Sequence, residues 1–192
     1  MDSKAVGFKN DLAVNIVDCS IVQSIDNQTI GIVFPIHAWG VPEAILGFVK
    51  KRMIVGKSPF AYGVCSCGAE AGYTMEKANN IFASNSMYSV AMANNYIMGA
   101  DVESDEIIAS KVVKAKDGVS TIADQVITKQ SVVGANKGKS PWIKSNLANF
   151  GFNKFARSTK PFYPTDKRIS CGQCAENCPA YTIRIMTENH IM

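Results

Sequence analysis

The chain lacks the features that mark several large functional classes. Its 192 residues hold no run of 18 apolar side chains, and the first ten, MDSKAVGFKN, lack the charged-then-apolar layout of a signal peptide. We therefore expect no transmembrane segment and a cytoplasmic location. Basic residues exceed acidic ones by only four. No nucleic-acid recognition motif accompanies them, so we expect no nucleic-acid partner.

Although the net charge is small, the basic residues gather in one part of the chain. Between Lys129 and Arg168 there are nine basic residues and one acidic residue, Asp166. This stretch is either a solvated linker or a docking surface for an acidic partner protein or anionic lipid, because a patch of one charge sign steers association. The sequence leaves both interpretations open.

What the sequence does contain is an alternation of apolar strands and helices. Four continuous apolar segments, typical of parallel strands buried on both faces, lie at 12–18, 29–36, 60–67 and 87–92. Helical patterns lie at 41–53, at 72–82 and after Ser104, which is the expected N-cap of a long amphipathic helix containing Gly118. The alternation predicts a doubly wound α/β domain.

The segments after this domain have a different composition. Residues 134–141, GANKGKSP, are typical of a linker, and 141–157 predict a short aromatic-rich helix interrupted near Gly151. We expect three parts: an α/β domain over 1–130, a basic linker with a short helix over 131–165, and a cysteine-bearing segment over 166–192.

Two loops at expected strand ends have an unusual composition. The loop FPIHAWG (34–40) contains Pro35, His37, Ala38, Trp39 and Gly40. The loop CSCGAEAG (65–72) contains Ser66, Cys67, Gly68 and Ala69. Open α/β sheets bind ligands at the carboxyl ends of their strands, and glycines let the backbone approach a flat ligand closely. On composition alone, a structural turn and a cofactor site are both consistent with these loops.

Three of the six cysteines lie within eight residues, in RISCGQCAENCP (168–179). Cys171, Cys174 and Cys178, followed by Pro179, have the spacing C-x2-C-x3-C-P, which is part of the run that holds [4Fe–4S] clusters in bacterial ferredoxins. The first cysteine of that run would fall at Arg168. In a reducing cell this clustering favours metal over disulfides. A Cys3His zinc site completed by His190, and a segment without metal, are alternatives.

Several stretches together resemble the fusion family called ferrodoxins, in which a flavodoxin-like domain precedes a two-cluster bacterial ferredoxin module. They are IGIVFPIHAWGVPEAI, FAYGVCSCGAEAGYT, YSVAMANNYI, NKFARSTKPFYPTD and ISCGQCAENCPAYTI. The resemblance implies a flavodoxin-like parallel sheet with FMN over its strand ends. It implies that residues 35–40 and 66–69 border the flavin, with Asn95 and Tyr96 nearby.

The chain departs from this family in two places. The first strand and the phosphate loop that binds FMN are missing, so we expect weakened FMN binding. No second cysteine run follows Cys178, so the cluster ligands are incomplete. We expect an electron carrier rather than a stand-alone enzyme, with FMN, [4Fe–4S] and redox partner proteins, impaired by truncation. The alternative is a non-redox binding module or gene fragment that uses the basic stretch.

Overall fold

The computed structural model describes residues 22–23, 26–57, 59–94, 96, 101–158, 163, 165, 167, 169–178 and 183–184. The predicted strand at 12–18 lies outside these residues. The chain divides into two compact units, Met1–Phe152 and Asn153–Met192. Within the described residues, no helix combines the length and apolar character that crossing a membrane requires.

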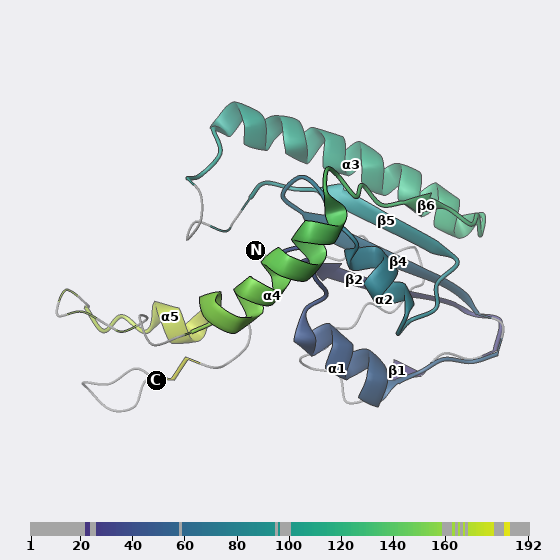
Figure 1. Ribbon diagram of the computed structural model, residues 1–192, viewed down its shortest axis with the longest axis horizontal. Coiled ribbons are helices and arrows are strands. Elements are labelled where there is room, and N and C mark those ends of the chain that lie inside the picture. The colour runs from purple at the N-terminus through teal and green to yellow at the C-terminus, as the bar shows by residue number, and fades with distance from the viewer. Residues whose placement is uncertain are drawn as a thin grey trace. The chain divides into compact units, whose positions relative to one another are not determined.

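The first unit is built on a sheet of four parallel strands (Figure 1), which confirms the α/β class. Its order is β2 (Thr29–Pro35), β4 (Phe60–Cys67), β5 (Ser86–Ala91) and β6 (Val133–Gly134). A separate parallel pair joins β1 (Val22–Gln23) to β3 (Met53–Ile54). The strand β6 was not predicted, because its two residues lie at the start of a glycine-rich, linker-like segment.

The predicted helices are confirmed. They are α1 (Glu43–Arg52), α2 (Thr74–Asn79) and α3 (Asp105–Ile127). The Ser104 hydroxyl caps α3 by accepting the Ile107 N–H at 3.5 Å. Gly118 does not interrupt this helix, which runs continuously from Asp105 to Ile127.

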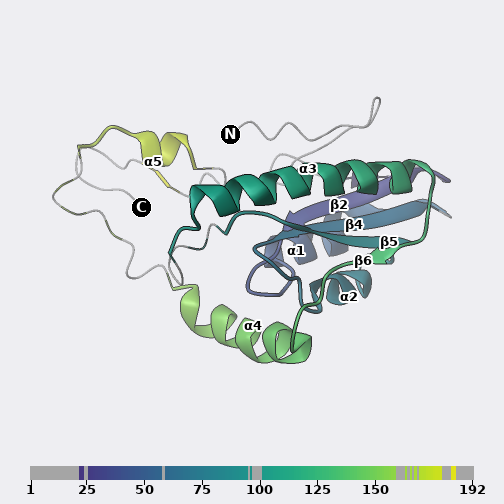
Figure 2. The same ribbon diagram turned by 90° about the horizontal axis from the view of Figure 1, so that it is seen from above.

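The helices cover the two faces of the sheet unequally (Figure 2). On one face, α1 and α2 pack on β2 and β4 around a core that includes Phe34, Cys65 and Met75. On the other face, Val126 of α3 packs with Phe60 and Tyr88. Among the described elements, only α3 covers the second face, so the sheet is covered on both faces where α3 reaches.

The prediction that all strands are buried on both faces is wrong for β2. Its residues alternate between exposed and buried, and Val33 is 69% exposed while Phe34 is 2% exposed. The reason is the position of α3, which packs against Phe60 and Tyr88 and leaves the Val33 side of β2 uncovered. Continuous apolar sequence does not distinguish a strand covered on one face from one covered on both.

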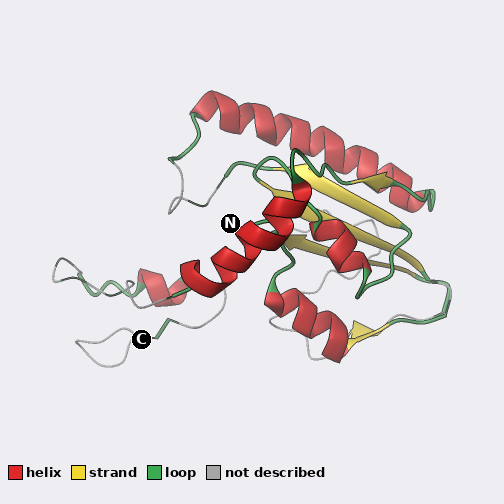
Figure 3. Cartoon of the chain, in the orientation of Figure 1, coloured by secondary structure: helices red, strands yellow, loops and turns green. Residues whose placement is uncertain are grey.

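A second helical region follows β6 and runs without a break over residues 141–156 (Figure 3). It consists of the π-helical η1 (Ile143–Ala148), α4 (Asn149–Gly151) and the π-helical η2 (Phe152–Ala156). The predicted interruption near Gly151 is wrong, because the helix changes there from α-helical to π-helical geometry but does not end. In the second unit, α5 (Gln173–Glu176) is a single short turn.

Neighbouring side chains of β2 test this one-sided burial. Phe34→Ala should lower the free energy of unfolding by about 3–5 kcal/mol, because it leaves a cavity in a filled core. Val33→Ala is the matched control and should change it by less than about 0.5 kcal/mol, as expected of an exposed side chain. Urea denaturation followed by circular dichroism measures both. Equal losses would mean that the Val33 face is covered.

Candidate ligand site at the strand ends

The pairing of β2 with β4 brings the two predicted loops together. The strands run parallel with Pro35 opposite Ser66, and the Ile36 N–H donates to the Ser66 carbonyl at 3.0 Å. Both strands therefore end at the same edge of the sheet. Pro35 and His37 are exposed there, Ser66 is half-buried and Cys67 is buried.

The first loop is a tight turn. His37 and Gly40 exchange two backbone hydrogen bonds of 3.0 Å, and the residues between them, Ala38 and Trp39, have φ of 45° and 58°. Non-glycine residues adopt this left-handed conformation at an energetic cost. Contacts from elsewhere in the protein must therefore hold the turn.

Those contacts come from the helical region 141–156. The Asn149 amide donates to the carbonyls of both His37 and Ala38 at 3.0 Å. A Cβ atom at Gly40 would lie 2.3 Å from the same amide nitrogen, so only glycine allows this approach. The turn and the helix are thus fitted to each other.

The same helical region also holds the second loop. The hydroxyl of Ser145, whose side chain is buried, accepts the Tyr73 N–H at 2.7 Å, and the Ser145 carbonyl accepts from the Lys77 ammonium. Gly72 has φ of 59°, and a Cβ there would lie 2.4 Å from the Ser145 hydroxyl and 3.3 Å from Trp39. Trp39 therefore packs against the backbone at Gly72.

An ion pair adds to this contact. Glu70 pairs with Lys144 and accepts the Lys139 N–H at 3.1 Å. The hydrogen bond from Lys144 holds the pKa of the Glu70 carboxyl below its usual range. The Lys144 ammonium also lies 5.8 Å from the centre of the Trp39 ring, close enough for a cation–π contact.

The residues 66–69 are held from the opposite side, by α3. Lys111 donates to the Gly68 carbonyl at 2.7 Å and pairs with Glu103, which in turn accepts the Asn94 N–H at 3.2 Å. The hydrogen bond from Lys111 lowers the pKa of the Glu103 carboxyl. A cation is therefore fixed beside the backbone at Gly68.

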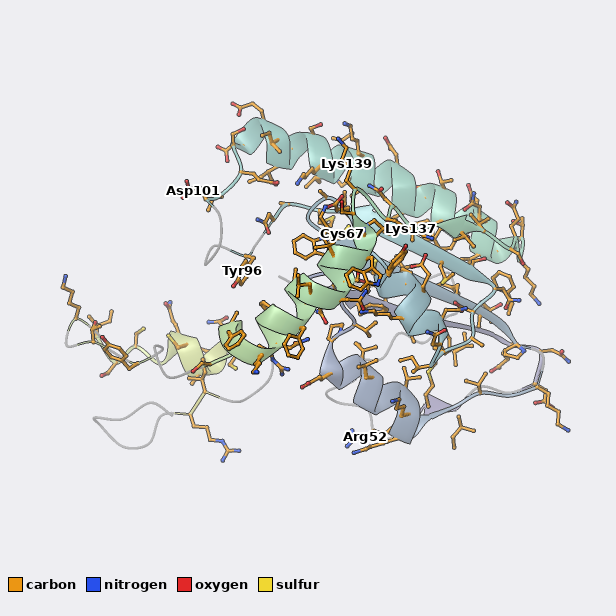
Figure 4. The ribbon with its side chains drawn as sticks, in the orientation of Figure 1. Arg52, Cys67, Tyr96, Asp101, Lys137 and Lys139 are labelled. Carbon is orange, nitrogen blue, oxygen red and sulfur yellow. The ribbon has the colours of Figure 1, made fainter. Side chains whose placement is uncertain are left out.

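Tyr96 follows β5 and supplies an aromatic ring at this end of the domain, where Cys67 ends β4 (Figure 4). Its N–H donates to the Asn94 side chain at 3.2 Å, and its ring meets that of Phe152 edge-on at 6.0 Å. The Tyr96 side chain is 46% exposed. Asn95, predicted with it, lies outside the described residues.

These groups suit a flat ring better than a phosphate. An exposed tyrosine, exposed Pro35 and Ala69, and backbone at Gly68 are surfaces on which a ring can lie. Phosphate binds at free helix N-termini. The helices α1 and α3 both begin with acidic residues, and the loop before α2 already donates the Tyr73 N–H to Ser145.

The cysteines that the structure describes fall into two environments. Cys65 is buried in the sheet, and burial raises the pKa of its thiol to about 12. Cys171 and Cys174 are exposed on either side of Gly172, whose φ is 79°, and Cys178 is half-buried just after α5. Over the described ranges, no three His, Cys, Asp or Glu side chains form a group that could hold a metal ion. His190 and Pro179 lie outside those ranges.

Sequence reasoning missed the residues that hold the loops. They are Lys111, Asn136, Ser145 and Asn149. Asn136, in the expected linker, donates to the Ala69 carbonyl at 3.2 Å, and its own carbonyl accepts the Ala71 N–H at 2.7 Å. The spacing of Ser145 and Asn149, four residues apart on one helix face, was the available signal for a polar packing surface.

Comparison with known proteins adds no relative. No family model matches the chain, and neither the curated proteins nor the solved structures contain a match.

Two glycines test the fit between helix and loop. Gly72→Ala should lower the free energy of unfolding by roughly 1–3 kcal/mol, because the new Cβ is strained at positive φ and collides with Ser145. Gly118→Ala is the matched control. It lies in α3 with nothing within 4 Å of the added Cβ, and it should raise stability by about 0.5–1 kcal/mol. A Gly72→Ala protein as stable as wild type would contradict the described contact.

Thiol reactivity tests the two cysteine environments. In reduced, chelator-treated protein at neutral pH, iodoacetamide should modify Cys171 and Cys174 first, because both are exposed. Cys65 should stay unmodified until denaturant is added, because its raised pKa keeps the thiol protonated and burial blocks access. Peptide mapping by mass spectrometry follows each site. Rapid labelling of Cys65 in folded protein would contradict its burial.

Proposed function

We propose that the chain is an electron-transfer protein of the flavodoxin–ferredoxin type. The observation that carries the proposal is the convergence of residues 35–40 and 66–69 at one edge of a parallel sheet. The cysteine spacing C-x2-C-x3-C-P supports it from the sequence. FMN bound at this edge would supply one-electron chemistry, and the protein would set its position and electrostatics.

The residues of the strand ends have distinct parts in this proposal. The Tyr96 ring and the backbone at Gly68 would hold the flat ring, and Pro35 and His37 would border it. The Lys111 ammonium, 2.7 Å from the Gly68 carbonyl, would place positive charge near a ring at this loop, offset in part by its ion pair with Glu103. Binding would be weak, because α1 and α3 both carry acidic residues in their first turns, which repel an anionic phosphate.

Cofactor measurement on the protein tests this proposal. Protein purified anaerobically, or reconstituted with FMN, iron and sulfide, should contain flavin and iron and absorb in the visible range. Tyr96→Ala should lower bound flavin without lowering bound iron. Cys171→Ser combined with Cys174→Ser should remove the iron, and Cys65→Ala is the control because Cys65 lies buried in the sheet.

Two results would decide against the proposal. If wild-type protein shows neither flavin nor cluster absorbance, the chain is not an electron carrier of this type. If iron is absent but zinc is present in stoichiometric amount, the cysteine segment is a zinc site.

A further inference from the structure

Two loops border the place proposed for the flat ring, which we call the ring site. Met92, just after β5, donates its N–H to the carbonyl of Cys67 at the end of β4 at 2.8 Å, so the chain leaves the sheet twice at adjacent points. A Cβ atom at Gly68 would lie 3.8 Å from the Asn94 side chain, which is ordinary van der Waals contact. The loop at Gly68 therefore lies against the loop that carries Tyr96.

One carboxylate connects these two loops. Glu103 immediately precedes the cap of α3, and its Oε1 atom pairs with the Lys111 ammonium, which donates to the Gly68 carbonyl at 2.7 Å. Its Oε2 atom accepts the Asn94 N–H at 3.2 Å, and the Asn94 side chain accepts the Tyr96 N–H at 3.2 Å. The contacts form a continuous chain from Gly68 to Tyr96, with Glu103 at its centre.

The pair of Glu103 and Lys111 is partly shielded from water. Their side chains are 22% and 21% exposed, and the hydrogen bond from Lys111 lowers the pKa of the Glu103 carboxyl. Salt screens a partly buried pair less than an exposed one, and removal of one partner leaves the other charge uncompensated. The pair therefore fixes both the position and the balance of charge beside Gly68.

We propose that Glu103 is a positioning residue for the ring site, where it holds Gly68 and Tyr96 in place through Lys111 and Asn94. The inference rests on the proposed function, since these two groups are the ones that would hold the ring. Glu103 would not touch the ring. It would offset the Lys111 charge and so limit how strongly a reduced, anionic ring is stabilised. A residue that only supports the fold would not affect the potential of the ring in this way.

Hydrogen exchange of the full chain without cofactor tests the connection between the loops. Glu103→Gln keeps the length of the side chain but offers one acceptor oxygen to two donors. Peptides covering 92–96 should exchange roughly threefold faster or more, because the Asn94 and Tyr96 N–H groups are released. Glu106→Gln is the matched control. Glu106 bonds Ser104 in the cap of α3, so this variant should exchange like wild type over 92–96.

Flavin titration of the same variants tests the role at the ring site. Glu103→Gln and Lys111→Met should each weaken FMN binding about fivefold, and the double variant should bind about as well as either single variant, because the two residues act as a unit. The midpoint potential of bound flavin should rise in Glu103→Gln, because the Lys111 charge is no longer offset. It should fall in Lys111→Met, because the cation is lost.

A further variant separates position from charge. Asn94→Ala removes the acceptor of the Tyr96 N–H but keeps the pair of Glu103 and Lys111. It should weaken FMN binding and leave the potential unchanged. Because it does not alter Glu103, it also tests the connection if Glu103→Gln does not fold, which circular dichroism of each variant shows.

The outcomes distinguish this inference from the proposed function. If the wild-type chain binds no flavin, the proposed electron transfer is wrong and the role of Glu103 at a ring is wrong with it. If the wild-type chain binds flavin and Glu103→Gln exchanges and binds like it, only the role of Glu103 is wrong. Potential shifts of the same sign in Glu103→Gln and Lys111→Met, or equal losses in Glu106→Gln, would also overturn that role.

Discussion

The parallel pairing of β2 with β4 is the interaction on which the rest of the domain depends. Its register places Pro35 opposite Ser66, so the chain leaves the sheet twice at neighbouring points. The same register places Phe34 opposite Cys65 on the face that α1 and α2 cover. The core and the candidate site are therefore two consequences of one alignment. A shift by one residue would turn Phe34 to the open face and separate the two loops.

The loops at these strand ends are stable only because a distant segment holds them. The turn at Ala38 and Trp39 has two non-glycine residues in the left-handed region, and its own two hydrogen bonds do not remove that cost. Asn149, more than a hundred positions along the chain, provides the additional bonds. Ser145 does the same for the backbone at Tyr73. The helix therefore helps to build the site, although its composition indicates a segment separate from the α/β domain.

The difference between local sequence signals and long-range contacts explains which features could be predicted from the sequence. The three longer strands and α1 to α3 follow from local signals such as apolar runs, the Ser104 cap and the charges of α1, and they are where the sequence places them. The coverage of β2 and the strand β6 depend on which helix packs where, and Asn149 acts through a contact with no local signature. The two loops were identified as candidate site segments, whereas the residues that hold them were not.

The basic stretch shows how charge is divided between structure and surface. Two of its lysines, Lys137 and Lys144, pair with Glu76 and Glu70, which lie on and before α2. These pairs attach the segment to the domain at the point where Ser145 enters, so the stretch is more than a solvated linker. A helix fixed by its polar side must present its remaining side chains outward, and in this chain those are apolar. The same contacts that hold the strand-end loops therefore also leave Trp142, Ile143 and Leu147 exposed.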